Sequence, residues 1–308
     1  MVLKWILLFC LITCGSLSGC SYHIMDQPNV IHQATPRPQY LPIQNGQVEY
    51  VRFGNGSPII LINGYSADIA SWDERFLAKL ATKHDVILFN NRNVGSSCIQ
   101  SNCYTTRCLA NDTYQLIQGL HLKNTAILGY SMGGIIAQQL TVIHPEAVGK
   151  LILMSTLIAG YQSVHINKKM RKQLFNLPRN PLMRFAISLQ LFFPEGARFE
   201  AANALLFHRF IPADYPFYSY PEESILKEQQ KLITSWCEDQ TVAPKIYRLL
   251  IPTLILSGDK DTTVPPLNSR ILATNIKSSK WVRWKEGGHA MVFQFPVEIA
   301  DEINAFLL

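Results

Sequence analysis

Charged side chains are scarce in this chain. Asp, Glu, Lys and Arg make up 16% of its 308 residues, against roughly 25% in soluble domains in general. Apolar residues reach 48%, which excludes a mainly disordered chain, and the length allows one large domain or two modest ones. The net charge of +6 is a mild basicity that could indicate nucleic acid or an anionic membrane surface.

Zinc motifs and internal repeats are absent as well. The seven cysteines and eight histidines contain no CxxC and no HExxH spacing, so a zinc framework is not expected. No segment repeats itself or has low complexity.

The apolar run near the N-terminus is too short to span a membrane. It covers residues 5–12, after Lys4, whereas a membrane span needs about 20 residues. A cationic start followed by a short apolar run is typical of a secretory signal. The string Leu17-Ser18-Gly19-Cys20 then resembles the lipobox of bacterial lipoproteins, in which the cysteine is acylated and cleavage precedes it. An ordinary secretory signal and a buried N-terminal helix are the alternatives.

The lipobox resemblance has consequences for location and partners. It implies that residues 1–19 are removed and that residues 20–40 form a proline-containing tether before a domain at 41–308. Two or more acyl chains would anchor the protein stably. Ser21, where Asp would retain the protein in the inner membrane, implies the outer membrane of a two-membrane cell envelope. Export would also remove nucleic acid as a partner, so the basicity says little.

Export also bears on the cysteines. Four remain beyond Cys20, at positions 98, 103, 108 and 237. In an oxidising compartment they could form two disulfides, with three possible connectivities. Free buried thiols are the alternative, and the spacing selects no pairing.

Short apolar runs alternate with helical patterns along the domain. Such runs are typical of strands buried on both faces of a parallel sheet. The predicted strands are residues 48–53 (in a hairpin after the Asn45-Gly46 turn signal), 58–62, 85–89, 125–128, 150–154, 252–256 and 279–285. The predicted helices are residues 72–81, 112–119, 132–144, 267–276 and 297–307. This alternation predicts an α/β fold with a doubly wound, mostly parallel sheet.

Residues 157–250 interrupt the alternation. They contain no strand-like run, and they hold 14 of the chain's 32 aromatic residues. We expect a helical cap inserted over the carboxyl edge of the sheet, whose aromatic side chains line an apolar pocket. An additional helical layer is the alternative.

A G-x-S-x-G string carries the clearest chemical signal. Gly129-Tyr130-Ser131-Met132-Gly133 follows a predicted strand and opens a predicted helix, which is the context that this nucleophile motif requires. The helix N-terminus behind Ser131 presents free N–H groups and a partial positive charge. A serine hydroxyl is a weak nucleophile at neutral pH and needs a general base.

Candidates for the base and the acid lie near the C-terminus. His289 stands in a Gly-Gly-His-Ala loop after the last predicted strand, whereas His208 lies within a helical run and is expected to pack. Asp259 and Asp261 both follow the strand at 252–256. One of them must accept the His289 N–H and fix its tautomer, but spacing does not choose between them.

Together these motifs resemble the α/β-hydrolase-fold enzymes, in the capped esterase, lipase and peroxidase-like superfamily, over residues 48–307. The resemblance implies a triad of Ser131, Asp261 and His289, because the family's acid follows a G-x-x-D pattern before a hydrophobic-Pro pair. Residues 63–66 resemble the oxyanion loop, which implies that the N–H groups of Tyr65 and Met132 hold the oxyanion. Residues 90–96 resemble the family's D-x-R-x-x-G-x-S turn.

Two departures from the family pattern concern residues outside the triad. Asn63 stands where the family usually has His, and Asn90 where it usually has Asp. The first change could alter how the oxyanion loop is braced, while its backbone donors remain. The second is expected to remove a buried charge from the turn.

The resemblance implies a serine hydrolase that cleaves apolar carboxylic esters through an acyl-enzyme, without metal or organic cofactor. A cofactor-free peroxidase and a C–C bond hydrolase are alternatives on the same fold. A surface binding protein without catalysis is an alternative from another class, although such proteins usually have lost a triad residue. The acyl chain length and the oligomeric state stay open.

Overall fold

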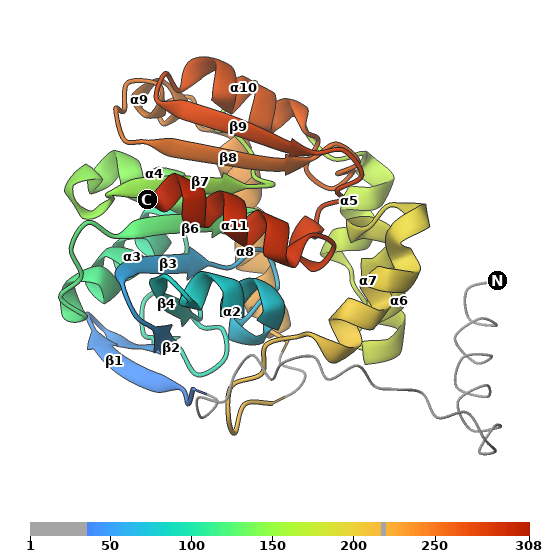
Figure 1. Ribbon diagram of the computed structural model, residues 1–308, viewed down its shortest axis with the longest axis horizontal. Helices are drawn as coiled ribbons and strands as arrows, with labels where there is room; N and C mark the ends of the chain where they lie inside the picture. Colours follow the sequence, from blue (N-terminus) through green and yellow to red (C-terminus); the bar gives the residue numbers. More distant parts are fainter. Residues whose placement is uncertain (1–35, 217–219) are drawn as a thin grey trace.

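The computed structural model describes residues 36–216 and 220–308 (Figure 1). The predicted signal peptide, Cys20 and most of the predicted tether lie outside the described residues. Within the described part, no helix combines the length and apolar character needed to cross a bilayer.

One mixed sheet forms the centre of the molecule, in the order β1-β2-β4-β3-β6-β7-β8-β9, with β5 paired to β2. Strands β1, β2 and β5 are antiparallel to their neighbours, and β4, β3 and β6 to β9 run parallel. The predicted α/β fold is confirmed, and each of the seven predicted strands is present. The bounds are β1 Gln39–Ile43, β2 Gly46–Gly54, β3 Ser57–Ile62, β4 His84–Phe89, β5 Cys98–Ile99, β6 Ala126–Tyr130, β7 Lys150–Met154, β8 Thr253–Gly258 and β9 Ser279–Trp284.

Helices cover both faces of this sheet, because the parallel strands are apolar on both sides. Helices α3 (Thr106–Gly119), α4 (Met132–Ile143) and α10 (Leu267–Asn275) contribute to one buried apolar cluster, and α2 (Glu74–Ala81) and α11 (Pro296–Leu307) to the other. Figure 1 shows α2 and α11 side by side in front of the sheet. Helix α3 begins six residues before the prediction, since Thr105 caps it by accepting a hydrogen bond from Cys108 N.

The segment between β7 and β8 is helical, and we call residues 157–250 the cap segment. It contains α5 (Lys168–Phe175), α6 (Pro181–Phe192), α7 (Arg198–Phe207), α8 (Glu223–Glu238) and α9 (Ala243–Ile246). Figure 1 shows α5, α6 and α7 beyond the arrowheads of β8 and β9. These three helices of the cap segment therefore lie at the carboxyl edge of the sheet, where ligands bind in open α/β folds.

One of the two possible disulfides is present, and the other two cysteines are free. Cys103 and Cys108 form a disulfide, which links the loop before α3 to its first turn. Among the described residues Cys98 and Cys237 are free thiols, the first exposed and the second buried. They cannot pair as placed, because Cys98 lies on the edge strand β5 and Cys237 on α8, where its thiol donates to Ser163 Oγ. Burial raises the pKa of the Cys237 thiol.

A buried ion pair joins the loop after β4 to α3. The Arg92 guanidinium donates two hydrogen bonds of 2.7 Å to the Asp112 carboxylate, and the two side chains are 7% and 4% exposed. We expect Asp112→Ala to lower the free energy of unfolding by about 3–5 kcal/mol, because Arg92 would stay buried without its counter-charge. Urea denaturation measures the change. Asp301→Ala, which removes a solvent-exposed partner of Lys79, should cost less than about 1 kcal/mol; equal losses in both variants would contradict the argument.

Candidate active site

Ser131 occupies a sharp turn between β6 and α4. Its backbone has φ 55° and ψ −118°, a left-handed region that costs a non-glycine residue about 1–3 kcal/mol and persists only where the surroundings enforce it. Three hydrogen bonds hold the turn: Ser131 N donates to Met154 O, Gly134 N donates to Ser131 O, and Thr156 Oγ1 donates to Ser131 O. The strained turn therefore holds the hydroxyl at the carboxyl end of β6.

The glycines on either side of Ser131 allow the close approach of the backbones. A side chain at Gly133 would collide with the carbonyl of Ile62 in β3, and one at Gly129 would come within 2.5 Å of the Gly133 carbonyl. Strands β3 and β6 are neighbours, with Ile62 opposite Gly129. The loop after β3 therefore passes directly beside Ser131.

His289 and Asp261 come from two further loops at the same edge of the sheet. His289 Nε2 lies 3.0 Å from Ser131 Oγ, and His289 Nδ1 lies 2.9 Å from Asp261 Oδ2. The Asp261 carboxylate is fully buried and also accepts the N–H groups of Thr263 and Val264 at 2.9 and 2.8 Å. The structure thus aligns the three predicted side chains in one chain of hydrogen bonds.

Asp259, which spacing left as an alternative acid, and His208, which was expected to pack, both lie elsewhere. Asp259 faces the surface and binds Arg283 through two hydrogen bonds of 2.8 and 2.9 Å, and these hydrogen bonds lower the pKa of its carboxyl group. His208 follows the last residue of α7, and its Nδ1 lies 3.1 Å from Glu74 Oε1. Neither side chain is part of the hydrogen-bonded chain at Ser131.

The loop formed by residues 63–66 lies against Ser131. A Cβ on Gly64 would be 3.1 Å from the Cβ of Ser131. The Tyr65 N–H donates to no acceptor within the described residues, and the Met132 N–H belongs to the first turn of α4, where helix geometry provides no acceptor. Asn63 braces the loop: its Nδ2 donates to Asp68 O, and its carbonyl accepts from Asn91.

The turn at Asn90 contains a buried carboxyl group, although Asn90 stands where the family usually has Asp. Asn90 Nδ2 donates to Glu49 Oε2 at 2.6 Å and to the Tyr215 hydroxyl at 2.9 Å, and Ser96 N donates to the same Glu49 oxygen. Glu49 is 2% exposed. The expected loss of a buried charge is therefore incomplete, since Glu49 on β2 supplies a carboxyl group to this turn.

Asn90→Asp should destabilise the protein in a pH-dependent way. The new carboxyl would face Glu49 at hydrogen-bond distance without a donor between them, and an uncompensated buried charge costs about 3 kcal/mol or more. Two adjacent carboxyls share a proton and hold it above the usual carboxyl pKa. The loss should therefore be smallest in mild acid and grow as pH rises through that elevated pKa. Urea denaturation between pH 4 and pH 8 measures it, and a loss independent of pH would contradict the argument.

Two cavities meet at Ser131. The larger has a volume of about 220 Å³ and the smaller about 60 Å³, and both are lined by Ser131 and Tyr65. Apolar side chains of the cap segment dominate the larger cavity: Leu174, Leu177, Pro181, Phe185, Phe192, Phe193 and Leu205. This lining suits an apolar ligand.

Two contacts on His289 were not anticipated. The Tyr130 hydroxyl donates to the His289 carbonyl at 3.2 Å, and burial keeps this phenol neutral by raising its pKa. The Phe192 ring lies 5.6 Å from the imidazole. Tyr130 precedes the nucleophile and could have been suspected, whereas nothing local to Phe192 indicates its contact.

Metal ligands do not gather at this site. Within residues 36–216 and 220–308, no group of three His, Cys, Asp or Glu side chains is placed to hold a metal ion. The chemistry available from the described residues is that of the hydroxyl, the imidazole, the carboxylate and the backbone donors.

Known proteins of similar sequence and fold carry several names. A Synechocystis protein provisionally named a non-heme chloroperoxidase is 27% identical over 85% of this chain and 93% of its own length. Lipase 3 of Moraxella sp. is 24% identical, over 82% of this chain and 77% of its own. The structure of an α/β hydrolase fold protein from Chitinophaga pinensis superimposes with a TM-score of 0.76 at 21% identity, over 89% of this chain and 98% of that one.

Other matched proteins include a Klebsiella pneumoniae protein provisionally named a carbamate hydrolase, which is 25% identical over 82% of this chain and 90% of its own length. The structure of an esterase from Rhodococcus sp. superimposes with a TM-score of 0.68 at 20% identity, over 89% of this chain and 98% of that one. The alpha/beta hydrolase fold family matches residues 57–296. Because this match covers well over half of the chain, the protein belongs to the alpha/beta hydrolase fold family.

Proposed function

We propose that the protein is a serine hydrolase that cleaves apolar carboxylic esters through an acyl-enzyme. The observation that carries the proposal is the hydrogen-bonded chain from Ser131 Oγ through His289 to Asp261, with distances of 3.0 and 2.9 Å. One relative named a lipase and another provisionally named a carbamate hydrolase support hydrolysis of an acyl bond.

Each group has a defined step. His289 Nε2 takes the proton from Ser131 as its oxygen attacks the ester carbonyl carbon. The tetrahedral oxyanion accepts hydrogen bonds from the N–H groups of Tyr65 and Met132. One such donor typically stabilises the transition state by about 2.7–4 kcal/mol. The protonated imidazole then gives its proton to the departing alkoxide, while Asp261 stabilises the imidazolium. Water, deprotonated by His289, releases the acid and restores Ser131.

A lipid anchor at Cys20 is the second element of the proposal. It is supported by the lipobox-like string Leu17-Ser18-Gly19-Cys20. The described part of the chain begins beside the cap segment, where Pro36 O accepts a hydrogen bond from Ala213 N. Labelling with radioactive palmitate should mark the expressed chain and not Cys20→Ala. An unlabelled wild type would refute the anchor, and envelope fractionation would locate the protein in the outer or inner membrane.

A fluorophosphonate probe tests the catalytic proposal directly. The probe reacts with serine only where a base activates it, so we expect stoichiometric labelling that mass spectrometry places on Ser131. Ser188→Ala is the matched control, because this serine also lines the larger cavity at Ser131. Labelling lost in Ser131→Ala and kept in Ser188→Ala supports the proposal. An unlabelled wild type would favour the surface binding protein instead.

A cofactor-free peroxidase is the second candidate, favoured by the name of the Synechocystis relative. A peroxidase of this kind would oxidise halide with hydrogen peroxide in the presence of a carboxylic acid, and Ser131→Ala would abolish that oxidation. Comparing that rate with ester hydrolysis in one preparation decides which activity dominates.

A further inference from the structure

The two cavities at Ser131 differ in their relation to His289. Of the two, His289 lines only the larger one, together with Phe192 and Phe293. The smaller one is lined by Met132 and by residues of α5 and α8 of the cap segment. An ester bound at Ser131 therefore has two unlike places for its two halves.

Proton transfer assigns the halves to the cavities. His289 Nε2 must deliver its proton to the departing alkoxide oxygen, which requires hydrogen-bond reach. The carbonyl oxygen points to the N–H groups of Tyr65 and Met132. The alcohol half therefore lies on the His289 side, in the cavity of about 220 Å³, and the acyl half lies in the cavity of about 60 Å³. The acyl half therefore has the smaller of the two volumes, which suits a short acyl group.

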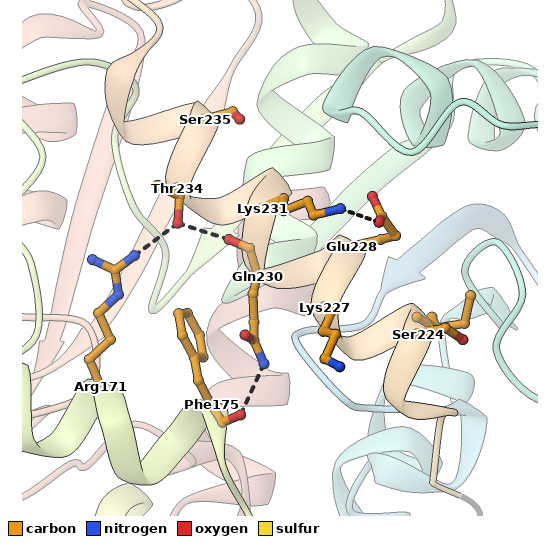
Figure 2. A pocket seen from close by; sticks show the side chains of 10 residues that line it. Arg171, Phe175, Ser224, Lys227, Glu228, Gln230, Lys231, Thr234 and Ser235 are labelled. Atoms are coloured by element: carbon orange, nitrogen blue, oxygen red, sulfur yellow. Dashed lines mark hydrogen bonds and ion pairs between the residues drawn. The ribbon is translucent and has the colours of Figure 1, made fainter.

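Three side chains close the smaller cavity from outside. Arg171 and Phe175 of α5 and Thr234 of α8 line this cavity, and they also line a surface groove of about 810 Å³ between the two helices. Figure 2 shows Arg171 and Phe175 reaching from α5 toward Thr234 and Gln230 of α8. The three residues, which we call the wall, separate the cavity from the groove.

Polar contacts hold the wall in place. Arg171 Nη2 donates to Thr234 Oγ1 at 2.8 Å, and its guanidinium lies 5.3 Å from the centre of the Phe175 ring. Gln230 Nε2 donates to the Phe175 carbonyl and to the Tyr65 hydroxyl, at 3.0 and 2.8 Å. The wall is thus tied to the residue whose N–H faces the oxyanion.

We propose that the smaller cavity is the acyl site and that the wall limits the length of the acyl chain. The substrates are esters of short carboxylic acids with large apolar alcohols. This inference rests on the proposed ester hydrolysis and adds its substrate class. Opening the wall would join the acyl site to the surface groove and admit longer chains.

Two ester series on the full chain test the assignment. The first varies the acyl group of p-nitrophenyl esters from acetate to decanoate, and the second varies the alcohol of acetate esters from ethyl to octyl. In the wild type we expect kcat/KM to fall about tenfold or more between butyrate and octanoate. Along the alcohol series we expect kcat/KM to stay constant or to rise. In Phe175→Ala the octanoate-to-acetate ratio should increase about tenfold or more.

The design allows for variants that fold poorly. The readout is a ratio within one preparation, so a reduced active fraction does not change it. Thr234→Ala opens the same wall with a smaller loss of packing and should shift the ratio in the same direction. Lys227→Ala, which lines the groove and not the smaller cavity, should leave the ratio at the wild-type value.

The outcomes separate this inference from the proposed function. Hydrolysis that is lost in Ser131→Ala but is fastest with long acyl chains in the wild type would overturn the acyl assignment alone. An unchanged ratio in both wall variants would overturn the role of the wall. A wild type that hydrolyses none of the esters would overturn the proposed function and this inference together.

Discussion

Replacing Ser131 with alanine is expected to lower kcat for ester hydrolysis by about 10⁶-fold. The loss is this large because Ser131 Oγ is the atom that bonds to the acyl carbon, and no other described hydroxyl lies beside a base of the same geometry. The residual rate would come from the N–H groups of Tyr65 and Met132 and from substrate binding. The measurement is the rate of ester hydrolysis by each variant, and titration of the active sites in the wild type converts its rate to kcat.

The double variant provides the sharper test. His289→Ala should cost nearly as much as Ser131→Ala, and combining the two should add almost nothing, because the pair acts as one unit. Additive losses would mean that the two residues act in separate steps and would contradict the proposed mechanism. Circular dichroism and a thermal melt of each variant exclude unfolding as the cause.

Replacing Asp261 with asparagine should lower kcat by about 10⁴-fold. The carboxylate accepts the His289 Nδ1–H at 2.9 Å, which leaves Nε2 free as the base toward Ser131. An amide at this position can donate to Nδ1 and so favour the tautomer with the proton on Nε2, which cannot accept the serine proton. The buried site accommodates asparagine without a change of volume, so we expect the loss in kcat and little change in KM.

Asp259→Asn is the matched control for this prediction. Asp259 lies two residues away and binds Arg283 at the surface, so activity should stay within about twofold, as befits an exposed pair. Its lowered carboxyl pKa means that the pair stabilises the fold above the unfolded pKa and that this contribution disappears as pH falls through the folded pKa. The stability difference between wild type and Asp259→Asn should therefore vanish in acid. A large activity loss at 259 rather than 261 would reverse the assignment of the acid.

The strands and the nucleophile turn were predictable because their signals are local. A strand buried on both faces must be continuously apolar, as β3, β6 and β8 are. The turn at Ser131 requires glycine on both sides, since any side chain there would meet backbone. Each of these constraints acts within a few residues, so it can be read without knowing what packs against it.

The partners of Asp259 and Asp261 were not predictable in this way. Both carboxyls follow β8 at nearly the same spacing, and only the paths of neighbouring segments distinguish them: Arg283 of β9 meets the first, and the loop that carries His289 meets the second. The cysteines illustrate the same limit, because Cys98 and Cys237 are separated by the placement of β5 and α8.

The family, the sheet and the reacting residue types follow from patterns within short stretches of this chain, where backbone sterics and burial leave few choices. The division of the space around Ser131 into two cavities does not follow from such local patterns. The smaller cavity and the wall of Arg171, Phe175 and Thr234 exist only where α5 packs against α8, and residues of α5, α6 and α7 line the larger cavity. The folded arrangement of the cap segment therefore sets which ester halves fit, because side chains distant in sequence meet there.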